Sequence, residues 1–288
     1  MGGGKFSTDA YALLRKSKDY GNKSREEIFT SRQIDPEMDP VKALVRESRD
    51  SEEHPETVSI IVALDVTGSM GFVPEHIVKE ALPDLISSLM EAGIEDPQVL
   101  FLGIGDFIYD SAPLQVGQFE SSAELLDRWL TRVYLEGGGG GNNQEGYNLA
   151  HLFAARHTSI DCWEKRKQKG FLFTIGDEPV FPTIPAEIIT RYTCTNTAET
   201  ITTEAIIKEA QEKYNVFHMH LEHDDWAKRD SRKGNWKELL GENYIEIPDY
   251  KTVAKRIAQV VIQNHKPAAY TNKNTPTAGT DTEIENML

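Results

Sequence analysis

The sequence predicts an α/β fold: a doubly wound, mostly parallel sheet with helices on both faces, of the Rossmann-like kind. Three apolar, β-branched runs, at residues 58–65, 98–106 and 170–177, have the composition of parallel strands that are buried on both faces. Segments with helical spacing of apolar residues lie between these runs. Alternation of this kind is typical of a parallel sheet that is covered by helices on both sides.

The first half of the chain supplies the opening elements of this fold. An amphipathic helix is expected within residues 8–20, and the first strand is VSIIVALD at 58–65. The stretch 74–93 predicts a helix that begins near Pro74, is kinked at Pro83 and stops at Gly93. The strand at 98–106 comes next, and 112–119 predicts a shorter strand, for which an antiparallel place at the sheet edge suits its length.

The second half continues the alternation of helices and strands. We expect a capped helix at 121–136, a helix at 145–158 after a glycine run, a strand at 170–177, a helix at 199–215, strands at 216–223 and 243–248, and a closing helix at 249–266. These elements define three parts: a polar N-terminal arm at 1–55, the α/β domain at 56–266 and a tail at 267–288. The tail is rich in Thr, Asn and Pro and is predicted to be disordered.

Charge and composition exclude several classes of function. The chain of 288 residues has 31 basic and 46 acidic residues and a formal net charge of −15. Such a charge repels phosphate backbones and anionic surfaces, so we expect neither a nucleic-acid nor a membrane partner. No stretch approaches the roughly 20 apolar residues of a membrane span, and no targeting segment is seen at the start. Only Cys162 and Cys194 are present, without metal-site or disulfide spacing. A cytoplasmic location fits best.

Polar side chains collect where the predicted parallel strands end. Because ligands bind at the carboxyl ends of such strands, these side chains are expected to share one rim. Their oxygen atoms are hard donors, which Mg²⁺, Mn²⁺ or Ca²⁺ prefers. Neutral hydroxyls would leave the ion electrophilic enough to accept an outside carboxylate as a further ligand. The candidate residues are Asp65, Thr67, Ser69, Asp106, Asn142, Asn143, Glu145 and Asp177.

The stretch DVTGSM at 65–70 resembles the D-x-[ST]-x-S signature of the metal-ion-dependent adhesion site (MIDAS) of von Willebrand factor A (vWA) domains. The resemblance covers roughly residues 57–265 and is most specific in this first loop. It implies that Asp65, Thr67 and Ser69 form the first ligand loop and that Asp177, in TIGDEP, belongs to the third.

The glycine run resembles the GGGD-x-x-E loop of intracellular members of this family. It places Asn142 where the family has an acid and Glu145 at the glutamate position, so Asn142 is a weaker, neutral ligand in place of Asp. Asp106 matches an acid that related intracellular domains carry after their second strand. The resemblance therefore implies metal ligands Asp65, Thr67, Ser69, Asn142 and Asp177, with Asp106, Asn143 and Glu145 behind them.

The function that this resemblance implies is non-enzymatic. An intracellular vWA-like protein would use Mg²⁺, with Mn²⁺ or Ca²⁺ as alternatives, to bind a Glu or Asp carboxylate of a partner protein. Intracellular members often work with AAA+ ATPases of the MoxR type, which makes such an ATPase the expected partner class.

An enzymatic reading remains as the alternative. DVTGS is also similar to the D-K-T-G-T motif of P-type ATPases and their haloacid-dehalogenase relatives, in which Asp65 would be a phosphorylated nucleophile and Asp177 would hold Mg²⁺. Val66 and Thr67 depart from that motif, because a basic residue and the acid-base Asp are expected at their positions.

A group of histidines in the strand at 216–223 raises the question of a second metal site. His218 and His220 share one face of the strand and His223 lies past its end. Zinc would need further ligands from elsewhere. Structural, half-buried histidines are therefore the favoured interpretation.

Overall fold

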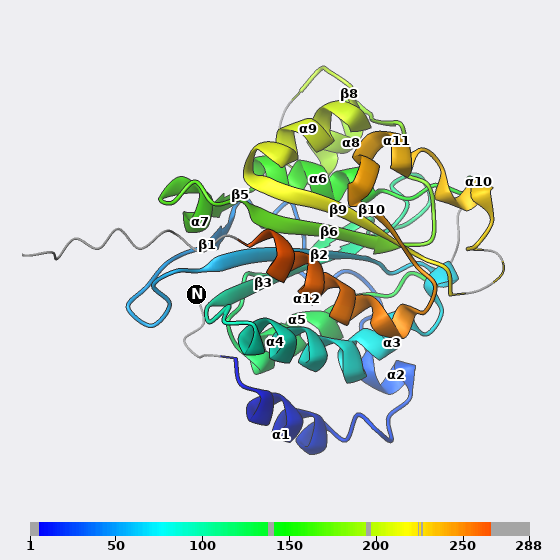
Figure 1. Cartoon of the computed structure of the whole chain (residues 1–288). Coiled ribbons are helices and arrows are strands. Elements are labelled where there is room, and N and C mark those ends of the chain that lie inside the picture. Colours follow the sequence, from blue (N-terminus) through cyan, green and yellow to red (C-terminus); the bar gives the residue numbers. More distant parts are fainter. Residues whose placement is uncertain (1–5, 138–140, 194–196, 224, 226, 266–288) are drawn as a thin grey trace, which may run out of the picture.

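The computed structural model describes residues 6–137, 141–193, 197–223, 225 and 227–265, and it confirms the predicted fold class (Figure 1). A six-stranded sheet has the order β10-β9-β6-β2-β3-β4, in which every pairing is parallel except that of β3 with β4. The strands are β2 (Val58–Asp65), β3 (Pro97–Ile104), β4 (Leu114–Val116), β6 (Gly170–Gly176), β9 (Tyr214–Leu221) and β10 (Tyr244–Ile247).

Strand β2 lies at the centre of the sheet, and its side chains supply both cores in turn. Ile60 and Val62 enter the core on one face, while Ile61 and Ala63 enter the core on the other. Successive side chains of a strand point to opposite faces, so a strand that is covered on both sides must be apolar throughout. This is the physical reason for the unbroken apolar run in the sequence.

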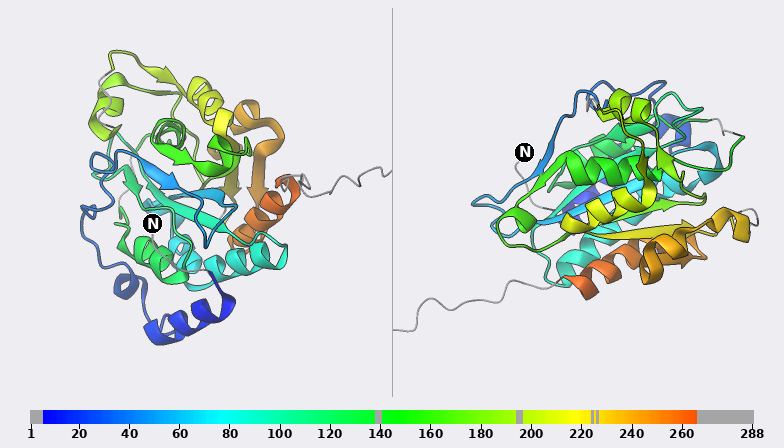
Figure 2. Two further views of the ribbon diagram at one scale, coloured as in Figure 1. Left: turned by 90° about the vertical axis from the view of Figure 1, so that its left-hand side faces the viewer. Right: turned by 90° about the horizontal axis from the view of Figure 1, so that it is seen from above.

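Helices cover both faces of the sheet (Figure 1). One core is closed by α4 (Leu82–Glu91), α5 (Ala123–Arg132) and α12 (Val253–Asn264). The other is closed by α6 (Tyr147–Arg156), α8 (Ala186–Thr193), α9 (Thr203–Lys213) and α11 (Trp236–Leu240). Figure 2 shows the sheet between these two layers. No helix among the described residues is long and apolar enough to cross a membrane.

The helix predicted for 74–93 is divided into three pieces. It consists of α3 (Val73–His76), a π-helical turn at Ile77–Ala81 and α4, and Pro83 lies in the first turn of α4. Proline lacks the amide hydrogen that a continuous helix requires, so the interruption occurs where the sequence predicts the kink. Gly93 has a left-handed φ of 83° and ends the segment as expected.

The N-terminal segment, residues 6–55, packs against the α/β domain (Figure 2). It contains α1 (Thr8–Lys18) and α2 (Arg25–Ile28). The backbone carbonyl of Met38, in this segment, accepts a 2.8 Å hydrogen bond from the amide of Val116 in edge strand β4. Several of its apolar side chains are buried in the cores of the domain: Phe6, Tyr20, Ile28, Phe29, Met38 and Ala43. The predicted disordered tail, 267–288, lies outside the described residues.

Short elements complete the fold. Strands β1 (Arg46–Ser48) and β5 (Thr158–Ile160) form a parallel pair, and β7 (Thr183–Ile184) and β8 (Ile201–Thr202) form an antiparallel one. Two single-turn helices, α7 (Asp161–Glu164) and α10 (Asp230–Lys233), lie in the connections.

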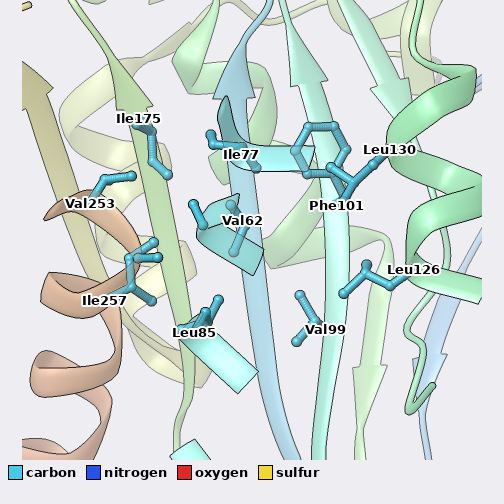
Figure 3. A pocket seen from close by; sticks show the side chains of 12 residues that line it. Val62, Ile77, Leu85, Val99, Phe101, Leu126, Leu130, Ile175, Val253 and Ile257 are labelled. Atoms are coloured by element: carbon cyan, nitrogen blue, oxygen red, sulfur yellow. The ribbon is translucent and has the colours of Figure 1, made fainter. Parts of the chain in front are cut away.

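The core between the sheet and the helices α4, α5 and α12 contains a small apolar cavity of about 20 Å³ (Figure 3). Val62 from β2 and Phe101 from β3 point into it from the sheet, and Ile257 of α12 approaches it from the helix layer. Ile77 of the π-helical turn also lines it. A cavity of this size has room for one methylene group and little more.

Candidate metal centre

The candidate site lies at the carboxyl ends of β2 and β6, the two central strands. Asp65 is the last residue of β2 and Asp177 directly follows β6. From β2 the chain proceeds to β3 and β4 on one side of the sheet and then returns to β6 on the other. Such a point of reversal leaves a crevice in which α/β sheets bind their ligands. The topology therefore brings together two acids that are 112 positions apart in the sequence.

The first loop is held by its own acid. Asp65 is buried, and its Oδ1 accepts hydrogen bonds from the amide of Thr67 at 2.9 Å and from the Thr67 hydroxyl at 2.6 Å. A short 3₁₀ turn, Gly68–Met70, follows and presents Ser69. The Ser69 hydroxyl donates to Oδ1 of Asp177 at 2.9 Å. Alternate positions 65, 67 and 69 thus converge because the strand ends in a turn that its acid stabilises.

The two hydroxyls suit a hard divalent cation. Oγ1 of Thr67 and Oγ of Ser69 are 3.3 Å apart, and each donates its proton to a carboxylate, which leaves lone pairs for another partner. Adjacent oxygen ligands of an octahedral ion are about 3.0 Å apart for Mg²⁺ and about 3.4 Å apart for Ca²⁺ at their usual bond lengths. Oδ2 of Asp177 is buried and has no hydrogen-bond partner among the described residues. These donors fit the implied ion.

The site does not resemble a metal centre built from charged ligands. In the described part of the chain, no group of three or more His, Cys, Asp or Glu side chains could hold a metal ion. The candidate donor set contains only two such side chains, Asp65 and Asp177, and its other members are the neutral side chains of Thr67, Ser69 and Asn142. A cation bound here would therefore keep more of its charge than one surrounded by carboxylates.

Burial makes the paired acids costly to ionise. Burial and the nearby charge of Asp177 raise the pKa of Asp65 to about 7, and burial raises the pKa of Asp177. The hydrogen bonds from Thr67 and Ser69 oppose this effect without cancelling it. A positive charge close to both desolvated carboxylates would stabilise their ionised forms.

The loop that contains Asn142 is bonded to the loop after β3. The side-chain amide of Asn142 donates to Oδ2 of Asp106 at 2.8 Å, and its Oδ1 accepts from the amide of Gln144 at 3.3 Å. Among the described residues, no hydrogen bond joins Asn142 to the hydroxyls or acids of the first loop. Direct ligation by Asn142 therefore stays a prediction. Asn143 is exposed and has a left-handed φ of 55°.

Asp106 and its neighbour Asp110 shape the loop after β3. Oδ1 of Asp106 accepts from the amide of Ile108 at 2.7 Å, so both of its oxygens are used. The carboxylate of Asp110 accepts from the amide of Asp106 at 2.7 Å. Asp106 therefore orders the loop after β3 and contacts Asn142.

Glu145 is buried beside the acids. Its amide donates to the carbonyl of Pro179 at 2.9 Å, which fixes the backbone next to the loop after β6. Burial, followed by the charge of Asp65, raises the pKa of Glu145 to about 11. Oε2 of Glu145 has no hydrogen-bond partner in the described chain. Its predicted place behind the ligands remains untested.

Tyr147 is a site residue that the sequence analysis missed. It is fully buried at the start of α6, and its hydroxyl donates to Oδ2 of Asp65 at 2.8 Å. The space that its ring occupies is left by Gly176, where a β-carbon would lie 1.8 Å from the tyrosine oxygen. The signal in the sequence is a tyrosine directly after the glycine loop, at the helix end that faces the strand termini.

The histidines divide between the core and the site. His218 is buried on β9, its ring stacks on Trp236 with centroids 3.8 Å apart, and its Nδ1 contacts the Thr174 hydroxyl at 2.9 Å. Nε2 of His220 contacts the carbonyl of Ala227 at 2.8 Å. These two are packed side chains, in line with the structural interpretation.

His223 instead reaches the candidate site. Its Nε2 lies 3.0 Å from the carbonyl oxygen of Ser69 and 4.0 Å from Oδ2 of Asp177. The imidazole therefore holds the turn that presents the serine hydroxyl, and its position past the end of β9 is what allows this contact.

A buried ion pair closes the site on the β6 side. Glu178 pairs with Arg232, and its backbone carbonyl accepts from Nε1 of Trp236 at 3.1 Å. Burial and the charge of Asp177 raise the pKa of Glu178 to about 8. Nothing in the local sequence indicated this pairing, because its two partners come from distant segments.

The similarities of this chain to known proteins are to solved structures. No protein-family model and no curated protein matches the chain. The chain is similar to the pilus adhesin SpaC from Lactobacillus rhamnosus GG in its open conformation, with 12% identity and a TM-score of 0.49, over 76% of this chain and 31% of the adhesin chain. A second crystal structure of that adhesin gives 11% identity and a TM-score of 0.47, over 76% and 32% of the two chains. The chain thus spans about a third of the length of the adhesin.

Proposed function

We propose that this protein is a non-enzymatic, vWA-like adaptor that binds a partner protein through a MIDAS-type divalent cation. The observation that carries the proposal is the pair of hydroxyls on Thr67 and Ser69, which lie 3.3 Å apart with their protons directed to Asp65 and Asp177. Mg²⁺ is the preferred ion, with Mn²⁺ or Ca²⁺ as substitutes.

Each residue of the site would have a separate role in binding the ion. Thr67 and Ser69 would offer lone pairs to the ion, while Asp65 and Asp177 would hold its charge and accept the hydroxyl protons. When bound, the ion would supply a Lewis-acidic position for a carboxylate oxygen from outside. Tyr147 and His223 would keep the acid and the serine turn in place.

Exposed apolar side chains support a protein as the partner. Phe72, in the loop that follows Ser69, is 74% exposed, and Ile108 and Tyr109, in the loop after β3, are 59% and 62% exposed. Both loops leave the carboxyl edge of the sheet. Apolar side chains around a charged centre are typical of protein-binding surfaces. The partner would present a Glu or Asp, and the resemblance of the sequence favours a cytoplasmic AAA+ ATPase of the MoxR type.

Calorimetric titration with Mg²⁺, Mn²⁺ and Ca²⁺ tests the site. Wild-type protein is expected to bind at least one of these ions, and Asp65→Ala and Ser69→Ala are expected to lose that binding. Ser17→Ala is the matched control, because Ser17 is an exposed serine on α1. Retention of binding by Ser69→Ala would remove the hydroxyl from the ligand set and overturn the proposal.

A phosphatase assay on the same proteins separates the adaptor from the enzymatic alternative. We expect no turnover with any of the three ions. Mg²⁺-dependent turnover that disappears in Asp65→Asn would instead identify Asp65 as a nucleophile. A chelator-sensitive interaction with a MoxR-type ATPase, lost in Ser69→Ala, would support the proposed partner class.

A further inference from the structure

The N-terminal segment touches the loop that carries the candidate ligands. The guanidinium of Arg25 donates a 2.7 Å hydrogen bond from Nη1 to the carbonyl of Gly71. In the opposite direction, Nζ of Lys79 donates to the carbonyl of Lys23 at 2.7 Å. One bond thus runs from the segment to the loop and the other from the domain to the segment.

Gly71 is the residue through which the loop's shape can be controlled. It directly follows the 3₁₀ turn Gly68–Met70, its amide donates to the carbonyl of Gly68, and its φ of 50° is left-handed. The turn places Ser69 so that its hydroxyl reaches Asp177. A change in the peptide orientation at Gly71 would therefore rotate the turn and move that hydroxyl.

Arg25 is itself well anchored. Ser24 and Glu27 form a reciprocal capping box around the start of α2, with hydrogen bonds of 3.3 Å and 2.7 Å. Ile28 and Phe29 are buried in the same core as Met70 of the turn. The guanidinium is thus presented from a fixed backbone, which lowers the entropy lost when it bonds to Gly71.

Apolar packing joins the segment to this core, but it does not fill the whole boundary between segment and domain. A hollow of about 330 Å³ is lined by Arg15 and Gly21 of the segment and by Phe72 and His76 of the domain. The Arg25 bond to Gly71 is a specific tie between them, next to the residues that would bind the ion.

We propose that Arg25 is a positioning residue of the metal site, and that docking of the N-terminal segment and binding of the cation stabilise one another. This inference rests on the proposed function. By linkage, if the docked segment improves cation affinity by some factor, the cation must improve docking by the same factor. The N-terminal segment is thereby a built-in regulator of the site.

Arg25→Met tests the inference because it keeps an unbranched apolar stem and removes the donor. Its Mg²⁺ affinity is expected to fall about fivefold, in keeping with the loss of one partly buried hydrogen bond. Arg25→Lys, which retains a charged donor, is expected to recover part of the loss. Arg32→Met is the matched control, since Arg32 is exposed further along the same segment, and it should bind as wild type does.

Hydrogen exchange supplies a readout that needs no metal. In metal-free protein, the amides of residues 66–72 should exchange faster in Arg25→Met than in wild type or Arg32→Met. Mg²⁺ should slow exchange at residues 23–29 in wild type and have no such effect in Ser69→Ala.

The outcomes separate the two proposals. Wild-type affinity in Arg25→Met, with unchanged exchange at 66–72, would overturn the role of Arg25 and leave the metal site standing. Absence of cation binding in wild type would overturn the metal site and the linkage with it, while the metal-free exchange would still decide whether Arg25 holds the loop.

Discussion

The hydroxyl of Tyr147 donates a 2.8 Å hydrogen bond to Oδ2 of Asp65, a residue 82 positions earlier in the chain. Both side chains are fully buried. The bond connects the first turn of α6 to the end of the central strand, so the acid of the first loop is oriented by a helix on one face of the sheet. It satisfies the one oxygen of Asp65 that the loop itself leaves free.

Tyr147→Phe is expected to destabilise the protein by about 1–2 kcal/mol, because the buried Oδ2 of Asp65 loses its donor. Urea denaturation of metal-free protein measures the effect. The control is Tyr109→Phe, whose side chain is 62% exposed and which should stay within about 0.5 kcal/mol of wild type. Equal stabilities of the two variants would show that the hydrogen bond contributes nothing.

Gly176→Ala is expected to cost about 2 kcal/mol or more, because the new β-carbon would lie 1.8 Å from the hydroxyl oxygen of Tyr147. The same substitution in a Tyr147→Phe background should cost less, since the atom in closest contact is gone. A double-mutant cycle by urea denaturation measures this coupling. Additive effects would contradict the predicted clash.

His151→Leu is expected to reduce the acid sensitivity of the fold. Burial lowers the pKa of His151 to about 3, and neither ring nitrogen has a hydrogen-bond partner among the described residues. The unfolded chain binds a proton here below about pH 6.5, whereas the folded chain does not. The stability contributed by neutral His151 is therefore present above pH 6.5 and is lost as the pH falls, by up to about 1.4 kcal/mol per pH unit.

Urea denaturation at pH 7.5 and pH 5.0 measures this difference. Wild type should lose about 2 kcal/mol more than His151→Leu between the two values. The buried acids have raised pKa values and act in the opposite direction, but they are common to both proteins and cancel in the comparison. Parallel losses in the two proteins would show that His151 is protonated in the fold.

Val62→Ile tests the cavity below the sheet. The added methylene can enter the space of about 20 Å³, so stability should be unchanged or rise by up to about 1 kcal/mol. Val216→Ile is the matched control, because Val216 belongs to the other core and does not line this cavity. The extra methylene of Val216→Ile cannot enter this cavity, so this variant should lose about 1–3 kcal/mol of stability through overpacking. Equal effects on the thermal or urea midpoint would contradict a usable cavity.

Local patterns were enough to predict most of the sheet. Strand β2 was predicted at 58–65 and observed at Val58–Asp65, because burial on both faces demands an unbroken apolar run. The convergence of Thr67 with Asp65 is also local, since an acid at a strand end bonds to the amide two residues on. Such features depend on neighbours in sequence and can therefore be read from it.

The remaining site contacts depend on the tertiary fold. Tyr147, His223 and Arg25 reach the first loop from three separate segments, and no periodicity marks a residue for such a contact. Asn142 illustrates the limit of reasoning from resemblance, because the structure pairs it with Asp106, a contact that only the fold creates. Its role as a ligand stays a prediction.

The hydrogen bond from the amide of Val116 to the carbonyl of Met38 has a consequence for association between copies of the chain. β4 is the edge strand of the sheet, and an edge with free amides is a template for further β-pairing. The guanidinium of Arg46 also contacts the carbonyl of Val116 at 3.3 Å. Proteolytic removal of the residues that contact this edge would leave a border able to pair with its counterpart on another molecule, and aggregation would follow.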